Sequence, residues 1–180
     1  MIREICVEYI MAMRMKLEAK KHEKTAPPRS LELICYMTFC RLRPEHMKLT
    51  YTEAMKAANN SKNFIHAAYF CRKLIDLPAG VVDNPMVEKY KKYYIQFSKL
   101  KSNAVDINLP SEMLDQTAET TANGTFDPSS LTLAPRSSSS LLSSVAHAVY
   151  PKSEEGKICA ICQLTRIGDI SRYPGLPGFK

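Results

Sequence analysis

The sequence predicts a mostly α-helical protein of antiparallel helical hairpins, similar to a tetratricopeptide solenoid, with a small C-terminal β-hairpin region. Apolar residues recur at spacings of three and four over most of residues 2–100, which is the period of an amphipathic helix. Short β-branched or apolar runs, separated by turn residues, occur near the end of the chain. We expect three parts: a helical hairpin domain at 1–101, a Ser/Thr-rich linker or extended tail at 102–145, and a small β-hairpin element packed on the helices at 146–180.

The first expected helix runs from Ile2 to His22. The paired prolines that follow cannot continue a helix. Ser30 is then a suitable N-cap for a second helix that reaches Leu42. The apolar stripe that we expect the first helix to bury consists of Ile2, Cys6, Tyr9, Met13 and Leu17.

Three further helices follow, and short turns separate them. Pro44 fits the first turn of the third helix. The fourth ends before Pro78, and Asp83 or Asn84 caps the fifth, which extends to about residue 100. Two adjacent alanines in the fourth helix, followed by large apolar residues and a terminal proline, are typical of a tetratricopeptide hairpin. Short connections predict that neighbouring helices are antiparallel.

The composition is that of a soluble globular protein, with 45% hydrophobic and 24% charged residues. No run approaches the ~18 apolar residues of a membrane helix, and the N-terminus mixes charges into its apolar positions, unlike a signal peptide. The net charge of +7 is concentrated in residues 1–100. Because clustered lysines are most often the solvated face of a helix, and no base-reading motif is present, we expect no nucleic-acid partner.

The cysteine pair Cys159-Ala-Ile-Cys162 is the one motif that suggests chemistry. In a cytosolic protein such a pair is half of a zinc site, a redox pair or two packed side chains. A structural zinc site needs four ligands, and only His147 offers a third nearby. We expect strands at 146–150 and 157–165, and cysteines three apart in a strand point to opposite faces. We therefore predict packing, with no metal and no cofactor.

Catalytic signatures are missing from the sequence. It contains no G-x-S-x-G, no Gly-rich phosphate loop and no H-E-x-x-H, and its four histidines are scattered. We therefore expect no enzyme, no catalytic residue and no small-molecule substrate.

The fifth helix carries the residues that we predict to bind a partner. Its aromatic side chains cover more than half of its circumference, which exceeds a core-facing stripe. Aromatic residues dominate interface hot spots. The alternative is that the serine-rich segment or the hairpin folds back over this helix. The four candidate residues are Tyr90, Tyr93, Tyr94 and Phe97.

Several segments, in order along the chain, resemble the C-terminal end of the coatomer alpha subunit family of the COPI vesicle coat. They are Glu4-Ile-Cys-Val-Glu-Tyr-Ile10, Pro44-Glu-His-Met47, Ala67-Ala-Tyr-Phe-Cys-Arg-Lys-Leu74 and Gly156-Lys-Ile-Cys159. The family usually has two further cysteines just ahead of the last segment, where this chain reads Ser143-Ser-Val-Ala-His-Ala-Val-Tyr150. Its alpha subunit is far longer, with propellers and a solenoid upstream, so we expect this chain to be one piece of it.

The resemblance implies a structural coat protein of the cytoplasm that takes part in Golgi-to-ER and intra-Golgi transport. It implies a peripheral location on Golgi membranes and COPI-coated vesicles, with indirect membrane association through an Arf-family GTPase. The implied partners are the coatomer epsilon subunit, itself a tetratricopeptide solenoid, and other coatomer subunits. A free-standing helical-repeat adaptor that binds short peptides is the alternative function.

Overall fold

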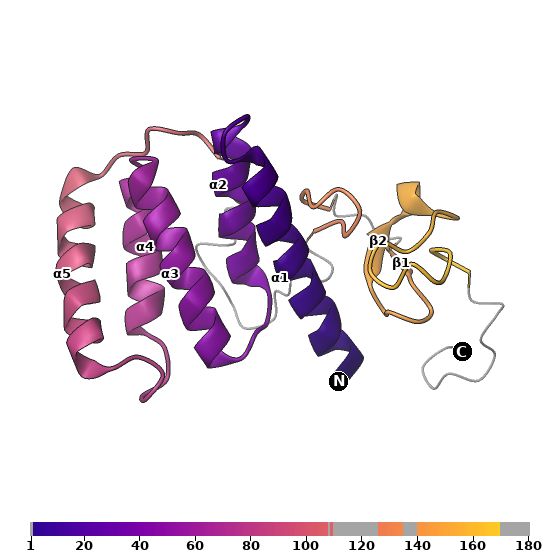
Figure 1. Cartoon of the computed structure of the whole chain (residues 1–180), viewed down its shortest axis with the longest axis horizontal. Helices are drawn as coiled ribbons and strands as arrows, with labels where there is room; N and C mark the ends of the chain where they lie inside the picture. The colour runs from indigo at the N-terminus through magenta and orange to yellow at the C-terminus, as the bar shows by residue number, and fades with distance from the viewer. Residues whose placement is uncertain (1, 108, 110–125, 135–139, 170–180) are drawn as a thin grey trace. The chain divides into compact units, whose positions relative to one another are not determined.

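The computed structural model describes residues 2–107, 109, 126–134 and 140–169. These residues divide into two compact units. One consists of residues 12–120, and the other combines residues 1–11 with residues 121–180. The described chain is mostly helical, with one small antiparallel sheet (Figure 1). The predicted fold class is confirmed.

The helices begin and end close to the positions that the sequence predicts. A short 3-10 helix, η1 (Met37–Phe39), follows the second of them. Helices α2 to α5 lie side by side in chain order, and each packs on the next (Figure 1). Their bounds are α1 Ile2–His22, α2 Pro27–Tyr36, α3 Pro44–Asn60, α4 Phe64–Ile75 and α5 Asn84–Leu100.

The start of α2 differs from the prediction. The two prolines form the first turn of α2, where their missing N–H groups cost nothing, and Ser30 lies inside the helix instead of capping it. The Ser30 hydroxyl is buried and donates a hydrogen bond to the Ala19 carbonyl of α1 at 2.8 Å. This polar residue therefore joins two helices.

The stripe predicted for α1 is wrong, because most of it faces solvent. Ile2 is 78% and Leu17 60% exposed, and Cys6 and Met13 are also exposed. The buried positions instead recur at a spacing of four along another face of the helix. Since α1 carries apolar residues on two faces, periodicity alone does not say which one is buried. The buried stripe is Val7, Met11, Met15 and Ala19.

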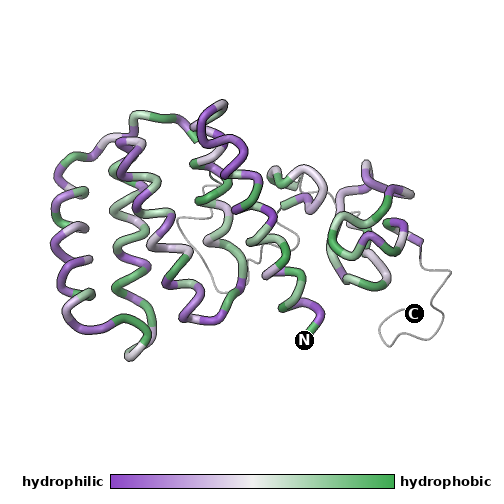
Figure 2. The backbone as a smooth tube through the Cα atoms, in the orientation of Figure 1, coloured by the Kyte–Doolittle hydropathy of each residue, from purple (hydrophilic) through white to green (hydrophobic). Residues whose placement is uncertain are grey.

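The centre of the helical layer is α4, which contacts both α3 and α5. Its small residues Ala67 and Ala68 are buried, as the hairpin pattern predicts, and its Phe70 ring stacks on Tyr51 of α3 with ring centres 6.5 Å apart. Figure 2 shows α4 as largely hydrophobic, whereas α5 is mainly hydrophilic. Within the described residues, no helix combines the length and the apolar character that crossing a membrane requires.

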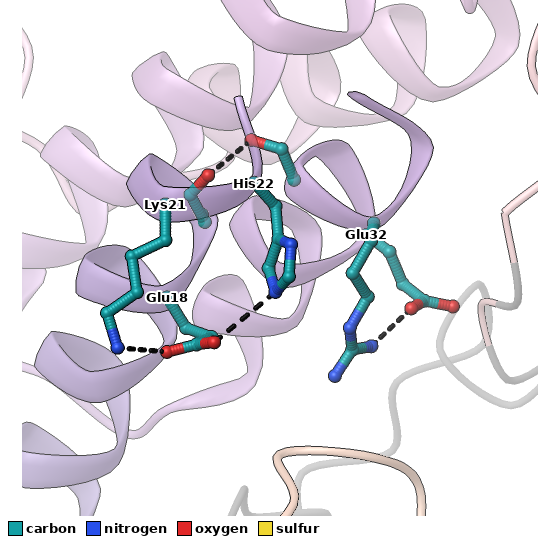
Figure 3. Close-up of polar contacts among 7 residues, drawn as sticks. Glu18, Lys21, His22 and Glu32 are labelled. Carbon is teal, nitrogen blue, oxygen red and sulfur yellow. Dashed lines mark hydrogen bonds and ion pairs between the residues drawn. The ribbon is translucent and has the colours of Figure 1, made fainter. Parts of the chain in front are cut away.

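Charged side chains at the end of α1 stay on its surface. Glu18 accepts a hydrogen bond from Lys21 at 2.7 Å and lies 3.3 Å from His22. Figure 3 shows both contacts as dashed lines. Hydrogen bonding to Lys21 lowers the pKa of Glu18. These basic residues also lie at the C-terminal end of a helix, where the helix dipole favours positive charge.

The segment after α5 turns back along the helices. Asn63, fully buried before α4, donates to the Val105 carbonyl and accepts from the Val105 N–H, each at 2.8 Å. Ile107 and Leu109 are partly buried against the helical core. One side-chain amide thus fixes the path of this segment.

Within residues 140–169 the chain forms two antiparallel hairpins. Strands β1 (Ser140–Leu142) and β2 (Val149–Pro151) pair, with Leu141 opposite Tyr150. A second, shorter hairpin pairs Ile158 with Arg166. The β-hairpin region is confirmed, but the strand expected at 157–165 is wrong, because residues 160–162 form a turn at the tip of the second hairpin. Strand β1 lies within the range predicted as a linker or extended tail.

Candidate functional site

A surface groove lies between α3 and α5. It has a volume of about 340 Å³. Met55 and Thr52 of α3 face Tyr90, Tyr93 and Phe97 of α5 across it. Met55, Tyr90 and Phe97 are buried at its base, and Tyr93 is partly exposed beside them. A partly exposed aromatic ring beside apolar residues is the kind of surface on which an apolar side chain of a partner binds.

The four predicted binding residues differ in how far the fold buries them. Tyr90 and Phe97 are buried in the helical core, while Tyr93 and Tyr94 are half-buried and pack against it. Tyr93 stacks on Phe97 with ring centres 6.0 Å apart, and Phe97 stacks on Phe64 of α4 at 6.1 Å. Of the four predicted residues, Tyr93 therefore combines groove lining with partial exposure, whereas Tyr94 is not among the lining residues.

Two lysines and polar amides surround the aromatic residues of the groove. Lys56 of α3 and Lys89 of α5 line the groove, and the Lys89 ammonium lies 5.7 Å from the centre of the Tyr93 ring. A cation over an aromatic face at this distance is attracted to the ring. The groove thus presents positive charge beside an apolar surface.

The cysteine pair lies in one turn, with the Cys162 N–H 3.5 Å from the Cys159 sulfur. Cys159 is fully buried, and its sulfur lies 3.2 Å from the Tyr150 hydroxyl. Burial opposes ionisation of Cys162, but hydrogen bonds from the Leu164 N–H and the Thr165 hydroxyl lower its pKa from 9.0 to about 7. By contrast, burial raises the pKa of Cys71 in α4 to about 12.

The two cysteines do not point to opposite faces of a strand, because a turn brings the N–H of one to the sulfur of the other. Among the residues that the structure describes, no group of three or more His, Cys, Asp or Glu side chains is placed to hold a metal ion. Packing of the wild-type pair stays a prediction.

Packed helices with a small antiparallel hairpin place the chain in the class of mostly helical proteins. Residues 1–172 match the family profile for the C-terminus of the coatomer (COPI) alpha subunit. The chain belongs to this family, as the sequence motifs indicated.

Relatives from several kingdoms support the assignment. The chain is 30% identical over 170 residues to coatomer subunit alpha-2 of Arabidopsis thaliana. The matched region covers 91% of this chain and 12% of that protein. It is 28% identical over 171 residues to coatomer subunit alpha of Dictyostelium discoideum (91% and 13%). It is 26% identical over 169 residues to coatomer subunit alpha of Saccharomyces cerevisiae (93% and 13%). The chain thus spans about an eighth of the length of these relatives.

The sequence reasoning found the α5 side of the groove but missed the α3 side. Met55 and Lys56 lie in a helix whose apolar residues were assigned to the core, and only the fold places them on the same groove as the α5 residues. The signal was weak but present, since Lys56 follows Met55 directly and places a charge at the edge of the apolar face.

Proposed function

We propose that this chain is a structural segment of the COPI vesicle coat that helps to hold the coatomer epsilon subunit. The observation that carries the proposal is that residues 1–172 match the family defined by the C-terminus of the coatomer alpha subunit. In this role it serves Golgi-to-ER and intra-Golgi transport, and it reaches the membrane indirectly, through other coat subunits and an Arf-family GTPase.

Within this proposal, the α3/α5 groove receives the epsilon subunit. Tyr93 supplies a half-buried aromatic ring, and Lys56 and Lys89 add positive charge beside it. An apolar side chain with a neighbouring carboxylate is the anchor that this groove would bind best. Exposed charge pairs are screened by salt, so the charged part of the contact weakens as ionic strength rises.

The first test is co-purification of the chain with the epsilon subunit. A stable one-to-one complex is expected. If only short peptides bind, and weakly, the chain is instead a free-standing helical-repeat adaptor. If neither binds, the proposed function is wrong.

The second test assigns the surface. Tyr93→Ala should weaken epsilon binding by roughly 1–3 kcal/mol while the melting temperature changes little. Tyr94→Ala is the matched control, because Tyr94 is also half-buried on α5 but does not line the groove. Equal losses from both variants, or from neither, would show that epsilon binds elsewhere. Phe97→Ala is unsuitable alone, because Phe97 belongs to the core.

A further inference from the structure

The two C-terminal hairpins end in turns that share one geometry. Residues 143–148 connect β1 to β2, and residues 159–165 form the tip of the second hairpin. In the first turn the His147 N–H donates to the Ser143 carbonyl at 2.8 Å. In the second the Gln163 N–H donates to the Cys159 carbonyl at 2.9 Å. In each turn, therefore, the first residue's carbonyl accepts a hydrogen bond from the backbone N–H of the residue four positions later.

The backbone angles and side-chain contacts repeat as well. His147 and Gln163 both have φ of 56°, a left-handed conformation that few residues other than glycine adopt. The Ala146 N–H lies 3.4 Å from the Ser143 hydroxyl oxygen, as the Cys162 N–H lies 3.5 Å from the Cys159 sulfur. Ser143 thus corresponds to Cys159, and Ala146 corresponds to Cys162.

Side chains of the two turns also meet. The Ser143 oxygen lies 3.8 Å from the Cys162 sulfur and 3.1 Å from the Thr165 hydroxyl. Ser143 and Cys159 are fully buried. Four thiolates around a zinc ion at about 2.3 Å are held roughly 3.8 Å apart by tetrahedral geometry. The contact between the turns therefore has the spacing of two ligands on one metal.

We propose that these turns are the two halves of a zinc-ribbon-type metal site, of which this chain keeps thiols on one half only. Its missing ligand positions are 143 and 146. Hydrogen bonds among Ser143, Cys162 and Thr165 connect the two turns at the position where a thiophilic divalent cation would bind. Turns that bring two C-x-x-C pairs together, each at the tip of a hairpin, are the scaffold that such an ion requires.

The test completes the site in the full chain. S143C/A146C should bind one Co²⁺ or Zn²⁺ per chain under reducing conditions, with the absorption of tetrahedral thiolate-bound cobalt. Zinc should raise its melting temperature. The wild type, with two thiols, should bind more weakly. S144C/V145C is the matched control, because it adds two thiols to the same turn at positions equivalent to Ala160 and Ile161.

Two single variants keep the test decisive if the double variant does not fold. S143C and A146C each supply a third thiol, and each should bind cobalt more tightly than wild type and less tightly than the double variant. Replacing Cys159 and Cys162 by alanine in the double variant should abolish the thiolate absorption. The proposal is overturned if neither the single variants nor the double variant bind cobalt more tightly than S144C/V145C.

Discussion

The helical layer and the C-terminal hairpins are stabilised by different interactions. The helical layer buries large apolar side chains such as Phe70 and Leu74 at its centre. The hairpins bury Ser143, Ser144 and Thr165 as well as Cys159. Hydrogen bonds made by these polar side chains help to fix the conformation of the turns. Burial of apolar area is non-directional, whereas each hydrogen bond fixes a position. Tyr150 and Ile167 are also buried in the hairpins. The helical layer should therefore lose most from apolar truncation, whereas in the hairpins the removal of a single polar group should also be costly.

The largest expected effect comes from emptying the centre of the helical layer. Phe70 is 1% exposed in α4 and contacts the rings of Tyr51 and Tyr69. Phe70→Ala should lower the free energy of unfolding by roughly 3–5 kcal/mol, because it leaves a cavity. Chemical denaturation measures this loss. Ile65→Ala, on the exposed side of the same helix, is the control and should cost far less. Similar losses in both variants would contradict the core described for α4.

The second-largest effect is expected from the loss of one buried polar contact in the helical layer, between Asn63 and Val105. Asn63→Ala removes both hydrogen bonds to Val105 and should cost roughly 2–3 kcal/mol, since a buried polar pair loses its partner. Urea denaturation reports the loss. Asn103→Ala removes only an exposed acceptor for the Ile65 N–H and should cost less than about 0.5 kcal/mol. If Asn63→Ala is as mild as its control, the segment after α5 is not fixed by this amide.

The same difference explains what the sequence could predict. Helical periodicity, Pro44 and the Asp83-Asn84 cap place the helices nearly correctly, because these signals act within a few residues. The α1 stripe failed because Val7 and Met11 compete with Ile2 and Met13 for the core, and the outcome depends on packing with other segments. Ser30 was misplaced for a related reason. Its acceptor, the Ala19 carbonyl, lies in another helix.

In the candidate sites, too, local sequence signals predicted some features, whereas others depend on packing with distant residues. Aromatic residues on α5 were found from their spacing, but spacing could not separate the core residue Phe97 from the half-exposed Tyr93. In the hairpins, the sequence predicts a strand where the cysteine turn lies, because Lys157 to Thr165 contains β-branched residues without a glycine at the turn. The left-handed position falls instead on Gln163, which gives no turn signal in the sequence.

A smaller effect is expected from one hydroxyl in the hairpins. The Tyr150 hydroxyl lies 3.2 Å from the Cys159 sulfur and accepts from the Ala160 N–H at 2.9 Å. Tyr150→Phe keeps the ring and removes both contacts, so it should cost roughly 1–2 kcal/mol. Hydrogen exchange of the 156–167 amides, together with thermal unfolding, measures it. Tyr94→Phe in α5 serves as the control and should stay within about 0.5 kcal/mol of wild type. Unchanged exchange in Tyr150→Phe would show that the hydroxyl does not stabilise the second hairpin.

The smallest effect is expected from the ion pair between Lys16 of α1 and Glu53 of α3. The ammonium nitrogen lies 2.7 Å from a carboxylate oxygen, but the two side chains are 50% and 36% exposed. Water and salt screen such a pair, so its coupling energy should be only about 0.2–1 kcal/mol. A double-mutant cycle with Lys16→Met and Glu53→Gln isolates the coupling, and repeating the cycle in high salt should reduce it further. The pair of Lys21 with Glu18, which lies within α1, provides a reference of similar geometry. A coupling well above 1 kcal/mol, insensitive to salt, would mean that charge and not apolar contact joins these two helices.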